Sequence, residues 1–578
     1  MAKRWIDVTV RVFLSIVVSR STAVLNNACR AATSEDRGIF QRPMRKVLTL
    51  FAMLISCLPA MATTTYVSQN GGVFSGGTAC NGQTTISIAT FNGNTYSAGA
   101  QIYFCGAITT AVTERGSGAS GNPITITFDT GARVSLPYCN SQCFSTGSNN
   151  YITINGGTPC GPGTSCTTTE AANPTGYPSG ITGIIEATDS GSSLDHQPSS
   201  GQLLIGSGTN IIIENLILRN EYVRTVSSDD VPNNTLSDAV AWYNSYLSVH
   251  DSTIHDVCTG LMNMASPVSY ISFYDNNVWN ANWGYGHGSG GTGLQEYIYI
   301  YNNHFGSPLN WDDPVNNPYH HNRIMMYQNG TPSSSDAYEY VYIYNNLMDG
   351  NMGCCSTSDV FFDVGPFINT YLFNNITTNV GQAYHVDNDY FTLGGGTLDT
   401  IWLYNNTSLG AGGSTETGGC IGFMGTTITL QNNIAADCNT LIPASESTTL
   451  TASNNLYGAG GAGGGGGGWI WQWNSTNCTT LSCWQSATST DTTGTAYYAS
   501  FSSLKVNSDG TLQAGSPAIS GGANLYGVCS GQPNPGLGAL CYDMAGNARP
   551  SSGAWDLGAY NSSDPGPLPP TGLVATAH

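Results

Sequence analysis

The sequence contains few charged side chains. Asp, Glu, Lys and Arg make up only 9% of the 578 residues, and 16 basic residues stand against 36 acidic ones. Nine of the basic residues come before position 63, so the rest of the chain keeps seven. A nucleic-acid interface needs a basic stripe, so this composition excludes nucleic acid as a partner. A polyanionic substrate would also be repelled unless a cation bridges it.

The sequence also lacks an apolar run of the ~20 residues that a membrane-spanning helix needs. Residues 44–46 are basic in character, residues 47–58 are apolar, and small residues follow up to Ala62, which is the pattern of a secretory signal peptide. We therefore expect residues 1–43 to be an extension from a start codon assigned too early, and residues 44–62 to be the signal peptide. An unusual leader that begins with the apolar residues 12–18 is the alternative. Either way, we expect a secreted or cell-surface protein with no transmembrane segment after processing.

The cysteines include no CxxC pair, which disfavours a zinc site. Fifteen of the 17 cysteines follow position 62, and export favours disulfides. Spacing alone suggests six pairs, which are Cys80 with Cys105, Cys139 with Cys143, Cys160 with Cys166, Cys420 with Cys438, Cys478 with Cys483, and Cys529 with Cys541. Cys258, Cys354 and Cys355 are left over, so at least one thiol is free or intermolecular.

What the sequence has in abundance is one phrase that returns along the chain. It alternates apolar and polar or aromatic residues and ends in a pair of amides, as in IYIYNN at 298–303. Copies lie at 271–277, 298–303, 341–346, 371–375, 401–406, 428–433 and 451–455. Counted from Asp275, the first residue of each pair steps by 27, 43, 29, 31, 27 and 22. Alternation with period two predicts a strand, and a recurrence at this distance predicts a solenoid.

Each repeat is predicted to form one coil, with strands of successive coils stacked in register as parallel sheets. Asparagine tolerates the left-handed backbone region, so the amide pairs are expected to form one sharp bend. Stacked asparagine side chains then bond to one another as a ladder. The step of 43 predicts one coil plus a loop that leaves the stack at about residues 306–340.

With these amide-ended repeats, the chain resembles the right-handed parallel β-helix proteins of the pectin-lyase-like superfamily over roughly residues 63–560. The resemblance implies an all-β, right-handed parallel β-helix solenoid; an antiparallel sandwich is the alternative. The expected organisation is an N-terminal cap with first strands at 63–121, the parallel β-helix at 122–515, a C-terminal capping segment at 516–560, and a Pro-rich linker with the start of a truncated further module at 561–578.

Aligning the segments between successive amide pairs predicts one column of ionisable side chains on an outer face. Coils stack at about 4.8 Å, so four such positions lie within roughly 15 Å. The catalytic candidates in this column are His287, His321, Arg323, Asp363, His385 and Asp387.

Three chemistries fit these residues. Glycoside hydrolysis needs two carboxyls, about 5–5.5 Å apart for retention or roughly 6.5–9.5 Å for inversion. Asp363 with Asp387 or Asp389 could meet either spacing, and Asp312 or Asp313 could supply one partner. β-Elimination of a uronate polymer needs a base, such as Arg323 or a histidine, and a Ca²⁺ ion held by acids. The Ca²⁺ candidates, in the lyase case only, are Asp312, Asp313 and Asp389. Binding alone needs aromatic platforms for sugar rings. The substrate-binding candidates are Trp283, Tyr285, Trp311 and Tyr384.

Two short phrases carry a partial family likeness. GHG at 286–288 resembles the Gly-His-Gly of polygalacturonase-type hydrolases, although no Arg-x-Lys follows it. HHNRI at 320–324 resembles a His-His-Asp-Gly-Ile phrase of secreted bacterial β-helix proteins, with Asn322 in place of the acid. We therefore predict a secreted, monomeric protein that acts on polysaccharide as a hydrolase or lyase, with Ca²⁺ as the one cofactor considered. The alternative is a non-catalytic carbohydrate-binding or adhesin-like surface protein.

Overall fold

The computed structural model describes residues 64–562 apart from 140, 178–179, 182, 189–200, 225, 227–236, 290–292, 312–320, 329–335, 353–357, 364, 381–382, 388–399, 411–418, 424–426, 439, 444–448 and 459–468. The chain divides into two units, Met1–Met61 and Ala62–His578. All described residues belong to the second unit. The predicted signal peptide, and the predicted linker segment from residue 563 onward, therefore lie outside the described residues.

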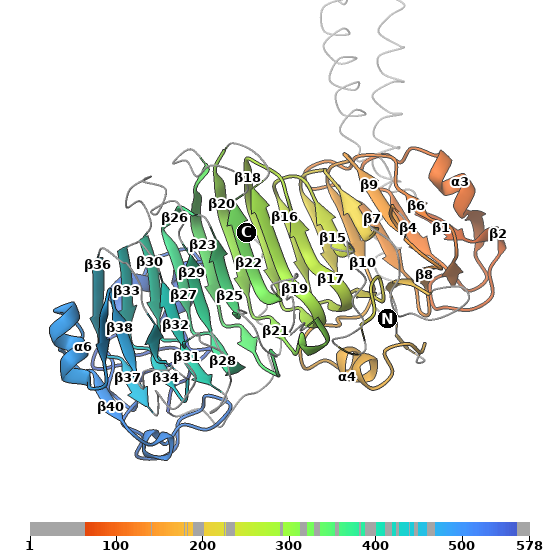
Figure 1. The fold of residues 1–578 in the computed structure, drawn as a ribbon. Coiled ribbons are helices and arrows are strands. Elements are labelled where there is room, and N and C mark those ends of the chain that lie inside the picture. The colour runs from red at the N-terminus through yellow and green to blue at the C-terminus, as the bar shows by residue number, and fades with distance from the viewer. Residues whose placement is uncertain are drawn as a thin grey trace, which may run out of the picture. The chain divides into compact units, whose positions relative to one another are not determined.

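Short parallel strands stack into three long faces, as Figure 1 shows. The first face belongs to a 16-stranded sheet. In stacking order, its parallel strands are β1 (Thr64–Ser68), β4 (Gln101–Phe104), β7 (Ile124–Phe128), β10 (Ile152–Asn155), β13 (Ile211–Glu214), β16 (Leu247–His250), β18 (Val268–Tyr274), β20 (Gln295–Tyr301), β23 (Tyr338–Tyr344), β27 (Thr370–Phe373), β30 (Thr400–Tyr404), β33 (Thr427–Gln431) and β36 (Thr449–Ser453). The short strand β26 (Phe367–Ile368) also pairs with β23.

The second and third faces form one 21-stranded sheet, because β17 (Thr253–Asn263) and β19 (Asn277–Ser289) run through both. The other second-face strands are β5 (Ala107–Ile108), β8 (Arg133–Leu136), β11 (Ile184–Ala187), β14 (Ile217–Arg219), β21 (His304–Phe305), β24 (Leu347–Met348), β28 (Ile376–Val380), β31 (Thr407–Gly410), β34 (Ile434–Ala436), β37 (Leu456–Gly458) and β40 (Ala496–Tyr498). The other third-face strands are β6 (Val112–Thr113), β9 (Phe144–Gly147), β12 (Gln202–Gly206), β15 (Asp238–Trp242), β22 (Asn322–Gln328), β25 (Val360–Asp363), β29 (Tyr384–Asp387) and β32 (Ile421–Phe423).

This arrangement confirms the predicted right-handed parallel β-helix. Strand alternation explains the core: Ile298 and Ile300 of β20 are fully buried and pair in register with Val341 and Ile343 of β23. One expectation is corrected. The long step between repeats is not a single loop leaving the stack, since it contains the 3₁₀ turn η1 (Leu309–Trp311) and β22, which is a full member of the third face.

The predicted asparagine ladder is present at the bend between the first and second faces. The second member of each pair is buried and donates its side-chain amide to the side-chain oxygen of the next one at 3.0–3.2 Å. The ladder runs through Asn276, Asn303, Asn346, Asn375, Asn406, Asn433 and Asn455. The first member of each pair has a left-handed backbone, with φ between 52° and 63°. The tandem amide therefore serves a turn and a hydrogen-bonded stack at once.

Other elements lie at the two ends of the stack (Figure 1). Near the N-terminal rungs, β2 (Asn70–Val73) pairs with β3 (Thr84–Ser87), and α3 (Ile88–Gly93) buries Phe91 against Phe104, with ring centroids 5.4 Å apart. Near the last rungs, β35 (Ile442–Pro443), β38 (Trp471–Trp473) and β39 (Thr476–Cys478) form a small sheet. Helix α6 (Leu481–Thr488) follows it, and Trp484 is fully buried in the main core.

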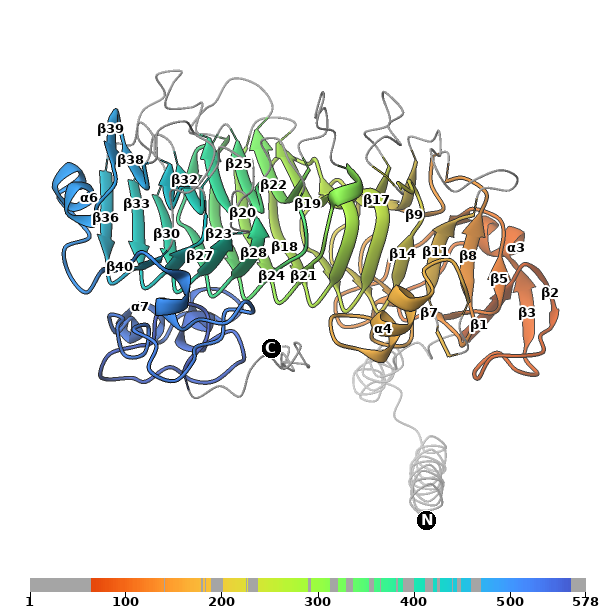
Figure 2. The ribbon, with the colours of Figure 1, turned by 60° about the horizontal axis from the view of Figure 1, so that its bottom comes forward.

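The C-terminal segment packs along the side of the β-helix, as Figure 2 shows. It contains η3 (Phe501–Leu504), α7 (Tyr526–Cys529) and η4 (Leu537–Cys541). Its Leu525, Leu540 and Trp555 share an apolar cluster with Tyr344 and Phe373 of the first face. These contacts lie along several rungs, so they do not support the predicted role of residues 516–560 as a cap over the open end.

The six cysteine pairs suggested by spacing all form disulfides. Cys258 is free and buried. Cys354 and Cys355 lie outside the described residues. Within the described part of the chain, no helix is long and apolar enough to cross a membrane.

Candidate functional site

Three neighbouring strands of the third face, β22, β25 and β29, bring part of the predicted column together. Tyr327 of β22 pairs in register with Asp363 of β25, which pairs with Asp387 of β29. In the adjacent column, Phe361 pairs with His385, and their rings lie 4.8 Å apart. The side chains of Asp363 and His385 are partly exposed. An acidic position and a histidine thus share one outward surface on adjacent rungs.

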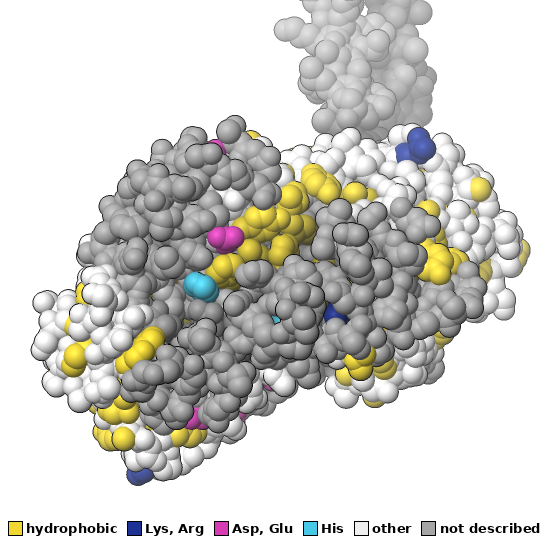
Figure 3. Space-filling view, viewed as in Figure 1, with side chains coloured by type: hydrophobic (Ala, Val, Ile, Leu, Met, Phe, Trp, Pro, Cys, Tyr) yellow, Lys and Arg dark blue, Asp and Glu magenta, His cyan; other side chains and the backbone are white. Residues whose placement is uncertain are grey.

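Aromatic side chains extend this surface toward the N-terminal rungs. Trp283 of β19 is partly exposed, and its ring lies 5.7 Å from that of Tyr327. We call the set of Trp283, Tyr327, Phe361, Asp363 and His385 the third-face strip. Figure 3 shows an acidic and a histidine side chain at the surface, beside a band of hydrophobic side chains. The strip therefore offers a carboxylate and an imidazole next to ring surfaces of the kind that contact sugars.

His287 is not part of this strip. Its position in β19 pairs with Met326 of β22, which faces the core, and the ring is fully buried. Nδ1 lies 2.9 Å from the Tyr285 hydroxyl, and Nε2 lies 3.0 Å from Oε1 of Gln295. Burial lowers the pKa of His287 to about 4, so the ring is neutral near pH 7. The prediction of His287 as a catalytic residue is wrong, because a substrate has no access to it.

Arg323, the second residue of β22, and His321, just before that strand, are also buried. The Arg323 guanidinium forms an ion pair with the buried carboxylate of Asp359. It also donates to the carbonyl oxygens of Gly306, at 3.1 Å from Nε, and of Gly350, at 3.2 Å from Nη2. His321 Nε2 contacts the carbonyl oxygen of Met352. Both predictions are corrected: these side chains bind the bends of neighbouring rungs and do not reach the surface.

Three of the four predicted sugar platforms are buried as well. Tyr285 and Tyr384 belong to the main hydrophobic core, with 0% and 2% of their surface exposed. Trp311 is fully buried beside Tyr222, and its ring lies beneath the Arg224 guanidinium at 4.9 Å. A ring without exposed faces cannot stack on a sugar, so only Trp283 keeps that role.

The predicted Ca²⁺ ligands Asp312, Asp313 and Asp389 lie outside the described residues. Of Asp387, the structure describes only the backbone. Among the described residues, no group of three His, Cys, Asp or Glu side chains is arranged to hold a metal ion. The metal prediction therefore stays untested.

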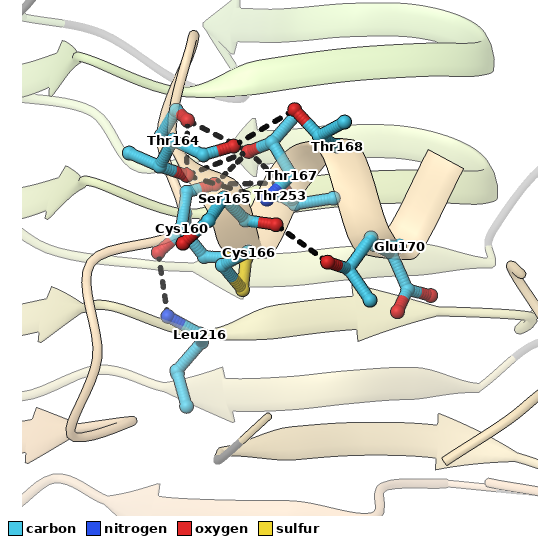
Figure 4. The surroundings of a disulfide bond; sticks show 12 residues. Cys160, Thr164, Ser165, Cys166, Thr167, Thr168, Glu170, Leu216 and Thr253 are labelled. Atoms are coloured by element: carbon cyan, nitrogen blue, oxygen red, sulfur yellow. Dashed lines mark hydrogen bonds between the residues drawn. A yellow bond between two sulfur atoms is a disulfide. The ribbon is translucent and has the colours of Figure 1, made fainter. Parts of the chain in front are cut away.

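A second ionic cluster, which the sequence analysis missed, lies beneath α4 (Ser165–Ala172) on the second face. Arg219 pairs with Glu170 at 2.5 Å and with Glu186 at 2.8 Å, and His255 Nε2 lies 3.0 Å from Glu170. The Cys160–Cys166 disulfide fixes the start of α4 (Figure 4). These side chains are almost fully buried, so the cluster attaches α4 to the helix wall and does not form a second reactive site.

Two residues of the strip, Tyr327 and Phe361, were also missed. Phe361 lies two residues from the predicted Asp363, and strand alternation was the signal that could have placed it. Tyr327 lies four residues from Arg323, the nearest predicted position. In β25, Phe361 and Asp363 are two residues apart and therefore share a face.

No protein-family model and no curated protein sequence matches this chain. Among solved structures, it is similar to the GH136 lacto-N-biosidase from Eubacterium ramulus, with 12% identity, a TM-score of 0.38, and coverage of 78% of this chain and 70% of that one. It is also similar to pectate lyase Pel9A, with 13% identity, a TM-score of 0.36, and coverage of 87% and 97%. A complex of XylC with xylose gives 9% identity, a TM-score of 0.39, and coverage of 86% and 98%. At these values, the likeness assigns no activity to this protein.

Proposed function

We propose that this protein is a secreted, polysaccharide-active β-helix protein that hydrolyses glycosidic bonds at the third-face strip. The observation that carries the proposal is the register pairing of Asp363 with Asp387 on adjacent strands. Adjacent strands lie about 4.8 Å apart, which is close to the carboxyl separation of about 5–5.5 Å that retaining glycosidases use. In this proposal one carboxyl is the nucleophile and the other is the acid and base.

The neighbouring side chains support a sugar ligand. The rings of Trp283 and Tyr327 are partly exposed and provide apolar surface on which a pyranose could lie, whereas Phe361 is buried and packs against the ring of His385. His385 sits one column from the carboxyl pair, where its imidazole can hydrogen bond with a sugar hydroxyl. The six disulfides support export, because disulfides persist in oxidising compartments.

A lyase mechanism has less support. β-Elimination requires a base at the substrate, and Arg323 or a histidine was the predicted base. The Arg323 guanidinium is buried and engaged by Asp359 and by backbone carbonyls, so it cannot accept a proton from a uronate ring. His287 and His321 are buried as well, which leaves the partly exposed His385 as the one candidate base in the third-face strip. Hydrolysis needs only the acid pair and water.

The test is an activity screen on a panel of neutral and uronic polysaccharides, with and without Ca²⁺. It should measure new reducing ends and the ultraviolet absorbance of unsaturated products. We expect reducing ends without unsaturated products. Asp363→Asn and Asp387→Asn should each lower the rate by at least about 100-fold, since each removes an acid–base or nucleophilic group.

Asp437→Asn is the matched control. Asp437 is a partly buried acid with a left-handed backbone (φ 59°), a conformation that asparagine also accepts. This variant should keep wild-type activity. Unsaturated products that require Ca²⁺ would show a lyase instead. Retention of a polysaccharide without any bond cleavage would show a binding protein.

A further inference from the structure

The first face carries a column of tyrosines, each directly before a buried residue that pairs in register with a neighbouring strand. In register, Leu247 of β16 pairs with Ile271 of β18, Ile271 with Ile298 of β20, and Ile298 with Val341 of β23. The residues that precede these four form the set that we call the tyrosine column. Its members are Tyr246, Tyr270, Tyr297 and Tyr340.

All four tyrosines have a left-handed backbone, with φ of 60°, 61°, 57° and 57°. This conformation is uncommon for a bulky side chain and costs free energy, whereas asparagine adopts it readily. Asparagine does occupy the same column on either side, at Asn210 (φ 59°) and Asn369 (φ 52°). The bend itself therefore does not need tyrosine. Strained backbone of this kind gathers at ligand-binding positions, where the side chain compensates for the strain.

The rings form a regular stack, with two exposed members and two partly exposed ones. Successive centroids lie 4.9, 4.9 and 5.0 Å apart, with interplanar angles of 15°, 8° and 7°. Tyr246 and Tyr270 expose 46% and 43% of their surface. Stacked rings cover one another's faces and present their edges and hydroxyl groups outward. A ligand that follows such a stack along the helix must itself repeat at a distance close to one rung.

At the end of the stack, the surface is hollowed. An open hollow of about 340 Å³ is lined by Tyr246 and Tyr270, by Asn210 and Ile212, and by Pro123, which directly precedes β7. Ile212 exposes 39% of its surface. The other residues that line the hollow are neutral, and several of them are serines and threonines such as Ser248, Ser272 and Thr153. An apolar floor with neutral hydroxyl and amide groups at its edges is a typical carbohydrate surface.

The charges near the column favour a neutral ligand. Glu296 and Glu339 directly precede Tyr297 and Tyr340 and pair with each other in register. The side chain of Glu339 has a raised pKa, first because of partial burial and then because of Glu296. None of the described residues that line the hollow is basic. A uronate polymer would meet these acids without a counter-charge, whereas an uncharged glycan would not.

We infer that the tyrosine column and its hollow bind a chain of a neutral, unbranched polysaccharide along the helix axis. This is a second carbohydrate site on a different face from the third-face strip. The inference rests on the proposed function in one respect, because it names a neutral glycan as the substrate class of that function. It assigns no bond cleavage to the column.

Affinity electrophoresis of the full chain tests the inference, in gels that contain a neutral β-glucan, a galactomannan, or polygalacturonate. We expect retardation by at least one neutral polymer and none by polygalacturonate. The double variant Tyr246→Asn with Tyr270→Asn should weaken retardation about tenfold or more. Asparagine fits the left-handed backbone, so this variant should keep the wild-type circular dichroism and thermal midpoint. Tyr526→Asn, at an exposed tyrosine of the C-terminal segment, is the control and should bind like the wild type.

The outcomes separate the two proposals. Hydrolysis that depends on Asp363, together with unchanged retardation of the tyrosine variant, would overturn the inference alone. Retardation that depends on the tyrosines, without hydrolysis of any polymer, would overturn the proposed hydrolysis alone. Equal retardation by polygalacturonate would overturn the neutral-ligand assignment. A dimer in sedimentation velocity that the tyrosine variant loses would show that a second copy of the chain occupies the column.

Discussion

Replacing Asn346 with alanine removes one complete step of the asparagine ladder. The Asn346 side chain donates to Oδ1 of Asn375 at 3.0 Å and to the carbonyl oxygen of Ile300 at 2.9 Å. Its own oxygen accepts from the backbone N–H of Asn303 at 3.1 Å and from the Asn303 side chain at 3.0 Å. All of these groups lie at a fully buried bend, where water cannot replace the lost partner.

The expected cost follows from the groups that lose a partner. Each side-chain amide of the ladder keeps one bond, because Asn303 still donates to Phe273 and Asn375 still accepts from the backbone of residue 346. The N–H of Asn303 and the C=O of Ile300 each lose the partner that Asn346 supplied. A buried polar group left unpaired costs ~1–3 kcal/mol, so two groups cost about 2–6 kcal/mol. That is a large part of the ~5–15 kcal/mol by which folded domains are usually stable.

Urea unfolding monitored by tryptophan fluorescence measures this difference. The midpoint of Asn346→Ala should fall with little change in slope, since the surface exposed on unfolding is the same. Asn345→Gly is the control one residue away: it removes an amide at φ 54°, outside the ladder, and glycine accepts that backbone. Its cost should stay below about 1 kcal/mol. Equal effects of the two variants would refute the view that the ladder, and not the amide content of the bend, stabilises the stack.

Three further predictions concern buried groups. Arg323→Met should destabilise the fold by about 3–5 kcal/mol because Asp359 is left as an unpaired buried charge, while Arg323→Met with Asp359→Leu should recover most of that loss in urea unfolding; a double variant as unstable as the single one would contradict a structural role for the pair. Replacing Cys160 and Cys166 with alanine should cost about 2 kcal/mol, from the short loop that their disulfide closes, and should raise hydrogen exchange in residues 160–172; unchanged exchange there would argue against it. Burial raises the pKa of Asp238 to about 7, so the folded state binds its proton more tightly than the unfolded state. The stability from this group is complete below about pH 4 and is lost as the pH rises through about 7, so Asp238→Asn should flatten the stability difference between about pH 5 and pH 8, and an unchanged difference would refute the assignment.

The fold could be predicted from the sequence because its determinants are local and repeated. In IYIYNN at 298–303, alternation defines the buried positions, and the two amides define the turn. The same pattern of alternation and paired amides recurs in each copy, so a copy with a weak pattern can be recognised from the copies on either side. Asn303 is an example: its place in the ladder follows from its place in the phrase, without knowledge of any distant residue.

The candidate site was only partly predictable because it depends on register. His287 pairs with Met326, and Met326 pairs with Phe362, the residue before Asp363. The predicted column was therefore one residue out of register at His287, and a shift of one residue in a strand turns a side chain from the surface to the core. Asp363 and Asp387 were aligned correctly, as the register of β25 with β29 shows.

Arg323 shows a second limit, which is the convergence of distant backbone groups. Its guanidinium is enclosed by carbonyl oxygens from residues 306 and 350 and by the carboxylate of Asp359. These partners are 17, 27 and 36 residues away from Arg323 in the chain. No sequence pattern shows which backbone carbonyl groups point inward. Because the protein has so few basic residues, a functional role was predicted for Arg323. The five N–H donors of a guanidinium can equally well bond to buried carbonyl oxygens.

The paired amides also explain why the C-terminal segment lies along the side of the helix. The second amide of each pair points into the ladder, whereas the left-handed backbone of the first directs its side chain to the outside of the bend. There Asn374 donates to the carbonyl oxygen of Tyr542 at 2.8 Å, Asn405 to that of Gly558 at 3.1 Å, and Asn432 to that of Ala523 at 2.9 Å. One repeated dipeptide therefore joins rung to rung with one amide and holds the C-terminal segment with the other. Since these bonds come from three successive rungs, the segment covers the wall of the solenoid where the aromatic rings of the first face would otherwise meet water.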